Sequence, residues 1–273
     1  MKTHSGVFRP PPPRRLRPVL SVVVPCWLGL LMVGPVNAVG QEQQSREARE
    51  KRIVAVEPSA SRTALLRRER SVLRLRAEGV PTIPHLPVIE DESEMKRRTK
   101  EEVARRAIAL LLVATKGEGL RQELVARVVE DYGAQPDFSP REAEFIGNPT
   151  PSQHERIQFT WRFEAAWTLL WSLGYVDRIE MPTGICDVER AIATLLERSR
   201  ERFITEATLR SPEEILDQAD LIYRYHWAVV DARLNGNPPP AGLEPGVVME
   251  RHYALNWLIG YMDQEWDDVS TDT

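Results

Sequence analysis

The sequence predicts an all-α protein, a single multi-helix domain whose helices are joined by proline-rich segments. From residue 61 the chain alternates segments of helical character with proline-rich turns. Two segments, at 139–142 and 211–214, begin with serine, proline and then glutamate at the third helical position, which is a strong helix-start pattern. No alternation of apolar and polar residues runs longer than a few residues, so we expect no strands.

The first expected helix covers residues 61–79, "SRTALLRRERSVLRLRAEG", and closes at Gly79 because glycine favours the backbone conformation that follows a helix. The three prolines of residues 80–89, "VPTIPHLPVI", then require an extended segment. A charged start and a strongly apolar second half predict a second helix within 93–119, and residues 118–133 predict a third helix ending at Gly133.

The remaining helices are expected at roughly 140–147, 153–173, 187–202, 212–234 and 247–265. Residues 235–246, "NGNPPPAGLEPG", form the loop between the last two helices. A short loop favours antiparallel packing, so we expect these two helices to lie side by side.

Residues 1–38 predict a signal peptide or a membrane anchor. Four arginines between residues 9 and 17 precede an uncharged run at 18–33, and Val36 and Ala38 are small residues suited to cleavage. The run is also long enough to stay uncleaved as an anchor, whereas a start codon assigned too early would make the protein cytoplasmic. The polar residues 39–60 predict a linker, and residues 61–273 the helical domain.

Composition limits the partners and the role of cysteine. Beyond residue 38 the chain holds 31 basic and 40 acidic residues, a formal net charge of −9, which argues against nucleic acid as a main partner. Cys186 is the one cysteine in this part, so it has no intrachain disulfide partner. It directly precedes Asp187, a predicted helix N-cap whose charge disfavours a thiolate, so we expect Cys186 to be buried or idle.

Four charges share one narrow stripe of the otherwise apolar helix expected at 212–234: Asp217, Asp220, Arg224 and Asp231. Arg224 follows Asp220 by one turn, so the two can pair. The stripe is either an exposed edge of a buried helix or a buried ion network. His226 falls on the opposite, apolar side, where a histidine is more often a hydrogen-bonded core residue than a ligand.

In the last predicted helix, Arg251 interrupts the apolar stripe and needs a carboxylate. The aspartates of the preceding helix are the expected partners, because the two helices should pack together. His252 and Asn256 lie one turn apart on a neighbouring face, where they would bind a ligand or hold a loop.

Glu164 lies three residues from both Trp161 and Trp167 in "WRFEAAWTLLW". Burial among tryptophans would raise the pKa of its carboxyl group, as a general acid requires. The alternative is a structural glutamate paired with an arginine at a helix contact. Tryptophans at helical spacing are more often core residues than a platform for sugars.

Several motifs that indicate a particular chemistry are absent from the sequence. It contains no HExxH, CxxC, Walker or GxSxG motif, and its histidines are scattered, so we expect neither a metal site nor a cofactor. The sequence alone names no reaction.

Several long blocks, among them "WRFEAAWTLLWSLGYVD", "RSPEEILDQADLIYRYHWAVVDARLNG" and "GVVMERHYALNWLIGY", resemble a bacterial family known as domain of unknown function 4272. The resemblance covers roughly residues 70–273, with the blocks in one order. It implies a helical domain without an assigned activity, so it supplies no catalytic residue. Most relatives look soluble and cytoplasmic, and the export-like amino terminus departs from them.

Two hypotheses follow. The first is a non-enzymatic bacterial domain, exported or membrane-tethered, that binds a protein partner or a small ligand and touches a membrane only through an uncleaved N-terminal segment. The alternative is a hydrolase with a pocket between the last two helices and the tryptophan-rich helix. Its candidate catalytic residues are Glu164, Asp220 and His252, and the candidate binding residues are Arg224, Arg251, Asn256, Trp161 and Trp167.

Overall fold

The computed structural model describes residues 60–273, and within this range all regular structure is helical, with no β-strand. The predicted all-α multi-helix domain is therefore confirmed. The predicted signal peptide or anchor at 1–38 and all but the last residue of the linker at 39–60 lie outside the described residues.

Between residues 60 and 273, none of the helices has both the length and the apolar character that crossing a bilayer requires.

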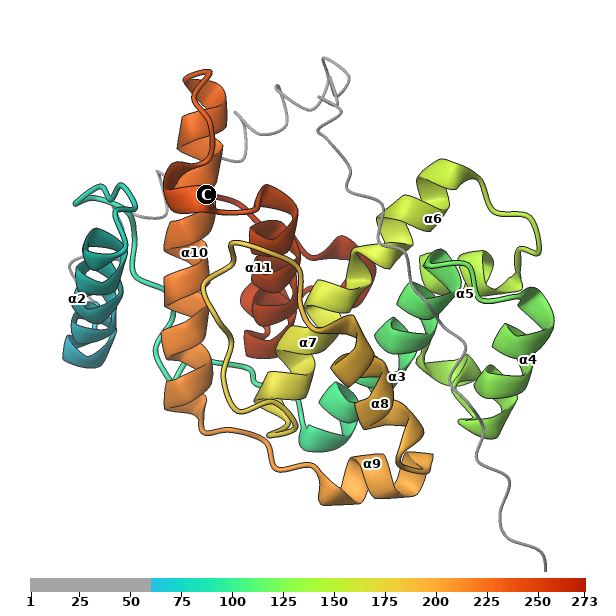
Figure 1. Cartoon of the computed structure of the whole chain (residues 1–273). Helices are drawn as coiled ribbons and strands as arrows, with labels where there is room; N and C mark the ends of the chain where they lie inside the picture. The colour runs from blue at the N-terminus through green and yellow to red at the C-terminus, as the bar shows by residue number, and fades with distance from the viewer. Residues whose placement is uncertain (1–59) are drawn as a thin grey trace, which may run out of the picture.

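Helix α3 (Lys100–Gly117) is the central helix of one part of the molecule, in which other helices surround it (Figure 1). It begins with a capping box in which the side chains of Thr99 and Glu102 each accept a hydrogen bond from the other residue's backbone N–H. Thirteen of its 18 residues are buried, so it is covered on nearly every side, as expected for a helix this apolar. The helices packed against it are α4 (Gln122–Asp131), α5 (Pro140–Gly147), α6 (Gln153–Thr160), α7 (Arg162–Ser172), α8 (Val188–Leu196) and α9 (Arg200–Glu206).

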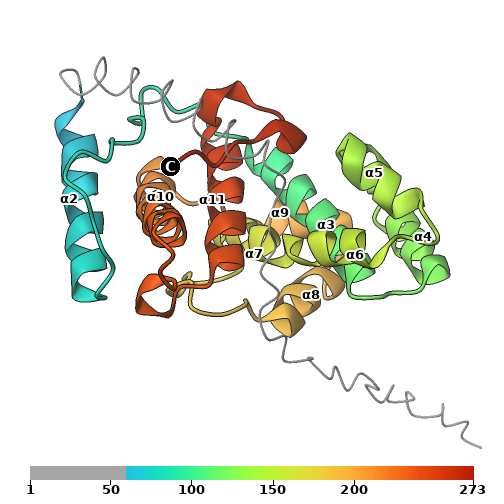
Figure 2. The same ribbon diagram turned by 90° about the horizontal axis from the view of Figure 1, so that it is seen from above.

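The other part is a row of helices built outward from α7. Helix α11 (Pro245–Ile259) packs on α7, α10 (Pro212–Leu234) on α11, and α2 (Arg62–Ala77) on α10. Figures 1 and 2 both show α2 at one edge of the molecule, beside α10. Short 3-10 helices occupy the connections at Gln135–Asp137, Pro240–Gly242, Tyr261–Asp263 and Trp266–Asp268.

The two predicted serine–proline helix starts are present. Ser139 begins α5 and Ser211 begins α10, and in each case the serine hydroxyl accepts a hydrogen bond from the backbone N–H of the glutamate three residues later. The side chains of Glu142 and Glu214 return the bond from the serine backbone N–H. These local patterns therefore placed both helix starts correctly.

Two predicted helices are each divided in the structure. The segment expected at 153–173 forms two helices, α6 and α7, which meet at Trp161. There the carbonyl of Trp161 accepts a hydrogen bond from the N–H of Glu164, three residues on, in place of the four-residue spacing of an α-helix. The segment expected at 187–202 is interrupted after α8, and Ser199 caps the new helix α9. In both cases the helical spacing of apolar residues continues across the break, so the sequence pattern predicts one helix where the structure has two.

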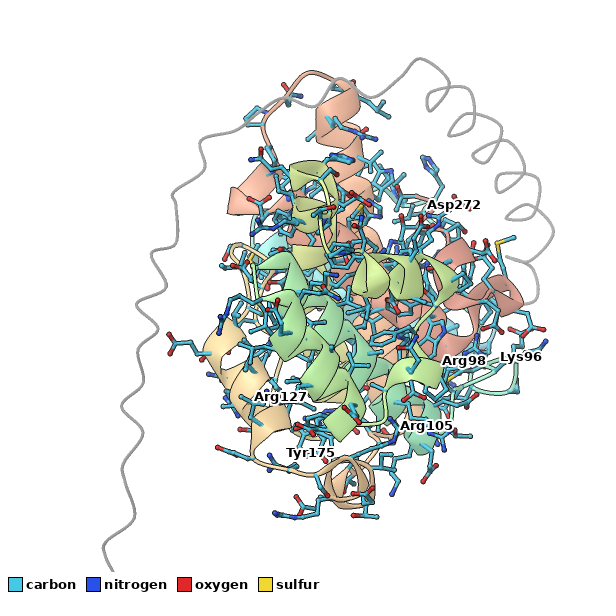
Figure 3. All side chains as sticks on the ribbon, turned by 90° about the vertical axis from the view of Figure 1, so that its right-hand side faces the viewer. Lys96, Arg98, Arg105, Arg127, Tyr175 and Asp272 are labelled. Atoms are coloured by element: carbon cyan, nitrogen blue, oxygen red, sulfur yellow. The ribbon has the colours of Figure 1, made fainter. Side chains whose placement is uncertain are left out.

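Helix α11 ends earlier than the predicted residue 265. Gly260 follows it with a left-handed backbone (φ 69°), and a Cβ atom built there would lie 2.5 Å from the carbonyl oxygen of Lys96. Only glycine fits this position. Beyond it the chain turns back, where Lys96 pairs with Asp263 at 2.8 Å and Arg98 donates to the carbonyl of Gln264. Figure 3 shows Lys96 and Arg98 beside each other.

A close contact between α3 and α6 depends on Gly117, because an added Cβ would lie 2.6 Å from Thr160 Oγ1 and 2.8 Å from the carbonyl oxygen of Arg156. We expect Gly117→Ala to lower the free energy of unfolding by about 1–3 kcal/mol through this clash. Gly147→Ala is the control, because nothing lies within 4 Å of its added Cβ. Urea unfolding checks this, and equal effects of the two substitutions would contradict the assigned contact.

Candidate functional site

The predicted site residues come from α7, α10 and α11 and from the junction before α7. Trp161 precedes α7, which carries Glu164 and Trp167. Asp220 and Arg224 belong to α10, and Arg251, His252 and Asn256 to α11. Since α10 packs on α11 and α11 on α7, most of these side chains lie in the interior of the row of helices.

Glu164 and Arg251 form a buried ion pair between α7 and α11. Both Nε and Nη2 of Arg251 lie 3.1 Å from Glu164 Oε2, and the side chains are 3% and 4% exposed. The other carboxylate oxygen accepts the backbone N–H of Cys186, and Nη1 of Arg251 donates to the carbonyl of Glu180 at 2.8 Å. The expected pairing of Arg251 with an aspartate of α10 is therefore wrong. Asp220 already has another partner, and Glu164 faces α11 instead.

Asp220 and Arg224 pair with each other within α10. Nε and Nη2 of Arg224 donate to the two carboxylate oxygens at 2.8 and 2.7 Å, and both side chains are at most 2% exposed. Nη2 also donates to the carbonyl of Pro87 in the proline-rich segment. For these two residues the alternative of a buried ion network is therefore the correct one, and it holds the segment after α2 against α10.

His226 and His252 meet between α10 and α11, with their Nδ1 atoms 2.8 Å apart. Both side chains are buried. One ring must donate to the other, so the pair holds this geometry only while at least one Nδ1 is unprotonated. Asn256, one turn beyond His252, donates from Nδ2 to the carbonyl of Ser270 at 2.8 Å and so holds the returning C-terminal segment.

The two tryptophans of the candidate site pack as structural residues. Trp167 is buried, with the guanidinium of Arg190 over its ring at 5.9 Å. Trp161 lies against the start of α11, so close that a Cβ on Gly246 would lie 2.8 Å from its ring. Trp167 therefore presents no exposed ring to a sugar, and the ring of Trp161 is used in the contact with α11.

A second buried ion network went undetected in the sequence. Arg106 of α3 pairs with Glu142, the glutamate that also caps α5, and Arg162 lies 3.0 Å from Glu250. The capping role of Glu142 was visible in the sequence, but its distant partner was not. Burial raises the pKa of Glu250, and the nearby Arg162 offsets only part of this rise.

Aromatic residues surround this second network. The guanidinium of Arg162 lies 4.7 Å from the ring centre of Tyr253, and that of Arg106 lies 5.0 Å from the ring centre of Trp266. Burial, followed in importance by the opposing effect of Arg162, sets the pKa of Tyr253 at about 12. This tyrosine is therefore a neutral hydrogen-bond donor, and its hydroxyl donates to the carbonyl of Trp266.

Within residues 60–273, no three His, Cys, Asp or Glu side chains are placed to hold a metal ion together.

The inner face of α2 is fixed by ion pairs to α10. Arg67 and Arg70 both reach Asp217, with nitrogen–oxygen distances of 3.3 and 2.5 Å. At the end of the helix, Glu78 pairs with Arg74 and accepts a hydrogen bond from the hydroxyl of Tyr225. The orientation of α2 is therefore set by α10, which decides which of its residues face outward.

An open groove of about 430 Å³ lies along the outer side of α2, with residues 82–84 of the proline-rich segment as its other wall. Leu65 and Leu66 are 38% and 44% exposed, and Arg62 and Arg76 are exposed as well. The sequence feature that could have indicated this groove is the composition of α2, in which six arginines and one glutamate are interspersed with leucines. The helix residues that line it are Arg62, Leu65, Leu66, Arg68, Glu69, Val72 and Arg76.

Comparison with known protein families gives one match. The model of the family described as "Domain of unknown function (DUF4272)" matches residues 67–269, from within α2 to beyond α11. No curated protein and no solved structure matches the chain.

Cys186 should be chemically inert in the folded protein. Burial, and next the negative charge of Glu164, raise the pKa of its thiol, so the reactive thiolate is scarce. We expect iodoacetamide to modify native Cys186 at least about tenfold more slowly than in urea, measured by mass spectrometry of its peptide. Equal rates in the two states would show that the site is open.

The pair of Glu250 and Arg162 should make stability depend on pH. Because the pKa of Glu250 is raised in the folded state, this state binds the proton more tightly than the unfolded chain does. Lowering the pH from about 7 to about 5 should therefore stabilise the wild type relative to Glu250→Gln, and raising it should remove that advantage. Urea unfolding at both pH values measures this. An unchanged difference would contradict the raised pKa.

Proposed function

Because the chain belongs to the DUF4272 family, which confirms the resemblance and whose description names no activity, we propose a function from its own residues. The domain binds an anionic, partly apolar ligand or partner in the groove along α2 and does not catalyse a reaction. Export or membrane tethering through residues 1–38 is part of this proposal, supported by the basic stretch and the uncharged run that follows it.

The observation that carries this proposal is the exposed apolar and basic surface of α2. Of the nine large apolar side chains that are exposed among residues 60–273, three are Leu65, Leu66 and Leu73 of this one helix. Clustered exposed leucines are unfavourable in water and commonly mark a contact surface. The exposed arginines beside them favour a partner with negative charge.

The candidate catalytic residues offer less support for a reaction. The side chains of Glu164 and Asp220 are each at most 3% exposed and bound to an arginine, so neither carboxylate faces a substrate. The hydrolase alternative would require α11 to separate from α7 before Glu164 became accessible. Breaking a buried ion pair in this way costs about 3–5 kcal/mol.

The dye 1-anilinonaphthalene-8-sulfonate, which is both apolar and anionic, tests the groove. We expect the full chain to bind it, and the double variant Arg62→Glu and Arg76→Glu to bind it about two- to fivefold more weakly in a fluorescence titration. Each reversed surface charge should weaken binding of the dye molecule beside it by roughly 0.5–1 kcal/mol. The side chains of Arg62 and Arg76 are exposed, so the variant should keep its fold.

A charge-matched double variant, Arg105→Glu and Arg127→Glu, is the control, because both arginines are exposed on the side away from α2 (Figure 3). Fluorescence from dye bound elsewhere on the chain should be the same in the wild type and the α2 variant. Equal affinity of the wild type and the α2 variant would contradict the proposal. Turnover of an ester or phosphoester by the wild type, abolished in a folded Asp220→Asn variant, would instead support the hydrolase.

A further inference from the structure

The groove and the exposed residues of α2 beside it run along the helix from Arg62 to Arg76. We infer that the occupant of the groove is the surface of an anionic lipid bilayer, so that α2 is a membrane-docking helix. This inference rests on the proposed function and specifies the partner of the same groove. It adds a membrane contact made by the folded domain itself to any contact made by the N-terminal segment.

The charge of α2 favours an anionic partner. The helix has six arginines and one glutamate, although the chain beyond residue 38 has a formal net charge of −9. Arg67, Arg70 and Arg74 form ion pairs, and of these three only Arg67 is buried. Arg62 and Arg76 are exposed at the two ends of the groove. An acidic protein that concentrates positive charge on one edge presents that edge to anions.

The spacing of these two arginines indicates the size of the partner. Arg76 follows Arg62 by 14 positions, so the two point to nearly the same side of the helix and lie about 21 Å apart along it. Leu66 and Leu73 fall between them on the same side, and Leu73 is 59% exposed. A small anion cannot reach both arginines, but a row of lipid headgroups can, and the leucines then enter the acyl boundary beneath it.

The attachment of α2 suits this role. Asp217 holds Arg67 and Arg70, and Tyr225 holds Glu78, so the exposed side of the helix is preorganised by α10. A docking helix that is already folded loses little conformational entropy on binding. The domain would then contact the bilayer through the edge formed by α2, which Figures 1 and 2 show beside α10.

The position of α2 in the chain also favours a membrane. Only 28 residues separate the end of the uncharged run at residue 33 from the first residue of α2. An uncleaved anchor would keep the helix within about 95 Å of the bilayer, which raises its effective concentration there. Weak individual signals, such as a short basic helix, bind membranes firmly when a second signal is present.

The groove surface of α2 also carries negative charge, and removing that charge should strengthen binding to anionic vesicles. Glu69 lines the groove between the two arginines, and Asp91 accepts a hydrogen bond from Thr63 at the first turn. On a zwitterionic surface Glu69 has little effect, but on an anionic surface its charge opposes binding. Glu69→Gln should therefore bind anionic vesicles several-fold more tightly than the wild type.

The test uses the full chain with Cys26→Ser and Leu66→Cys, labelled at position 66 with the fluorophore NBD, which brightens in apolar surroundings. Cys186 is buried and takes no label in the folded protein. The probes are phosphatidylcholine vesicles and vesicles that also contain phosphatidylglycerol. We expect a marked rise in NBD emission with phosphatidylglycerol, an apparent affinity at least about tenfold weaker after Arg62→Glu with Arg76→Glu, and no such change after Arg105→Glu with Arg127→Glu.

A label at the similarly exposed Leu196, 63% exposed on α8, should stay dim and so control for adsorption of the domain by another face. Equal emission from position 66 on both kinds of vesicle, unaffected by the arginine substitutions, would assign the contact to another part of the chain and overturn the inference. No response to either vesicle, while the dye still depends on Arg62 and Arg76, would also overturn it. In that case the proposed groove stands, with an acidic peptide as its partner. Loss of both responses would overturn both proposals.

Discussion

The ion pair of Glu164 and Arg251 is the interaction on which the arrangement of the other helices depends. It lies where α7, which packs on the central α3, meets α11, the first helix of the row that continues through α10 to α2. Both charges are removed from water, so each is tolerated only because its nitrogen or oxygen atoms have partners. The pair also uses the N–H of Cys186 and the carbonyl of Glu180, so the segment between α7 and α8 is tied to the same point.

The same principle continues outward and explains why the surface of α2 is the place to look for function. Arg224 neutralises Asp220 and holds the carbonyl of Pro87, and Asp217 neutralises Arg67. Each buried carboxylate in this row is occupied by an arginine, which leaves little acid–base capacity for chemistry. Arg62 and Arg76 lie exposed on the outer side of α2, next to leucines that nothing in the described part of the chain covers fully.

Local features of this fold were predictable from sequence and distant pairings were not. The capping boxes at Ser139 and Ser211 depend on residues three positions apart, so they appear in the sequence as they do in the structure. Arg251 finds its carboxylate 87 residues away, and no local pattern distinguishes Glu164 from the nearer aspartates of α10. Likewise, the arginines of α2 look alike in the sequence, and only the folded structure shows that Arg67 is the one buried beside Asp217.

A double-mutant cycle of Glu164→Gln and Arg251→Met, followed by urea unfolding, tests most directly whether the interior charges are structural. Arg251→Met alone should cost about 3–5 kcal/mol, because it leaves the buried carboxylate without its partner. The double variant should be more stable than the sum of the single effects predicts, with a coupling energy above about 1.5 kcal/mol. Effects that add within about 0.5 kcal/mol, or an Arg251→Met variant as stable as the wild type, would contradict the structural role assigned to this pair.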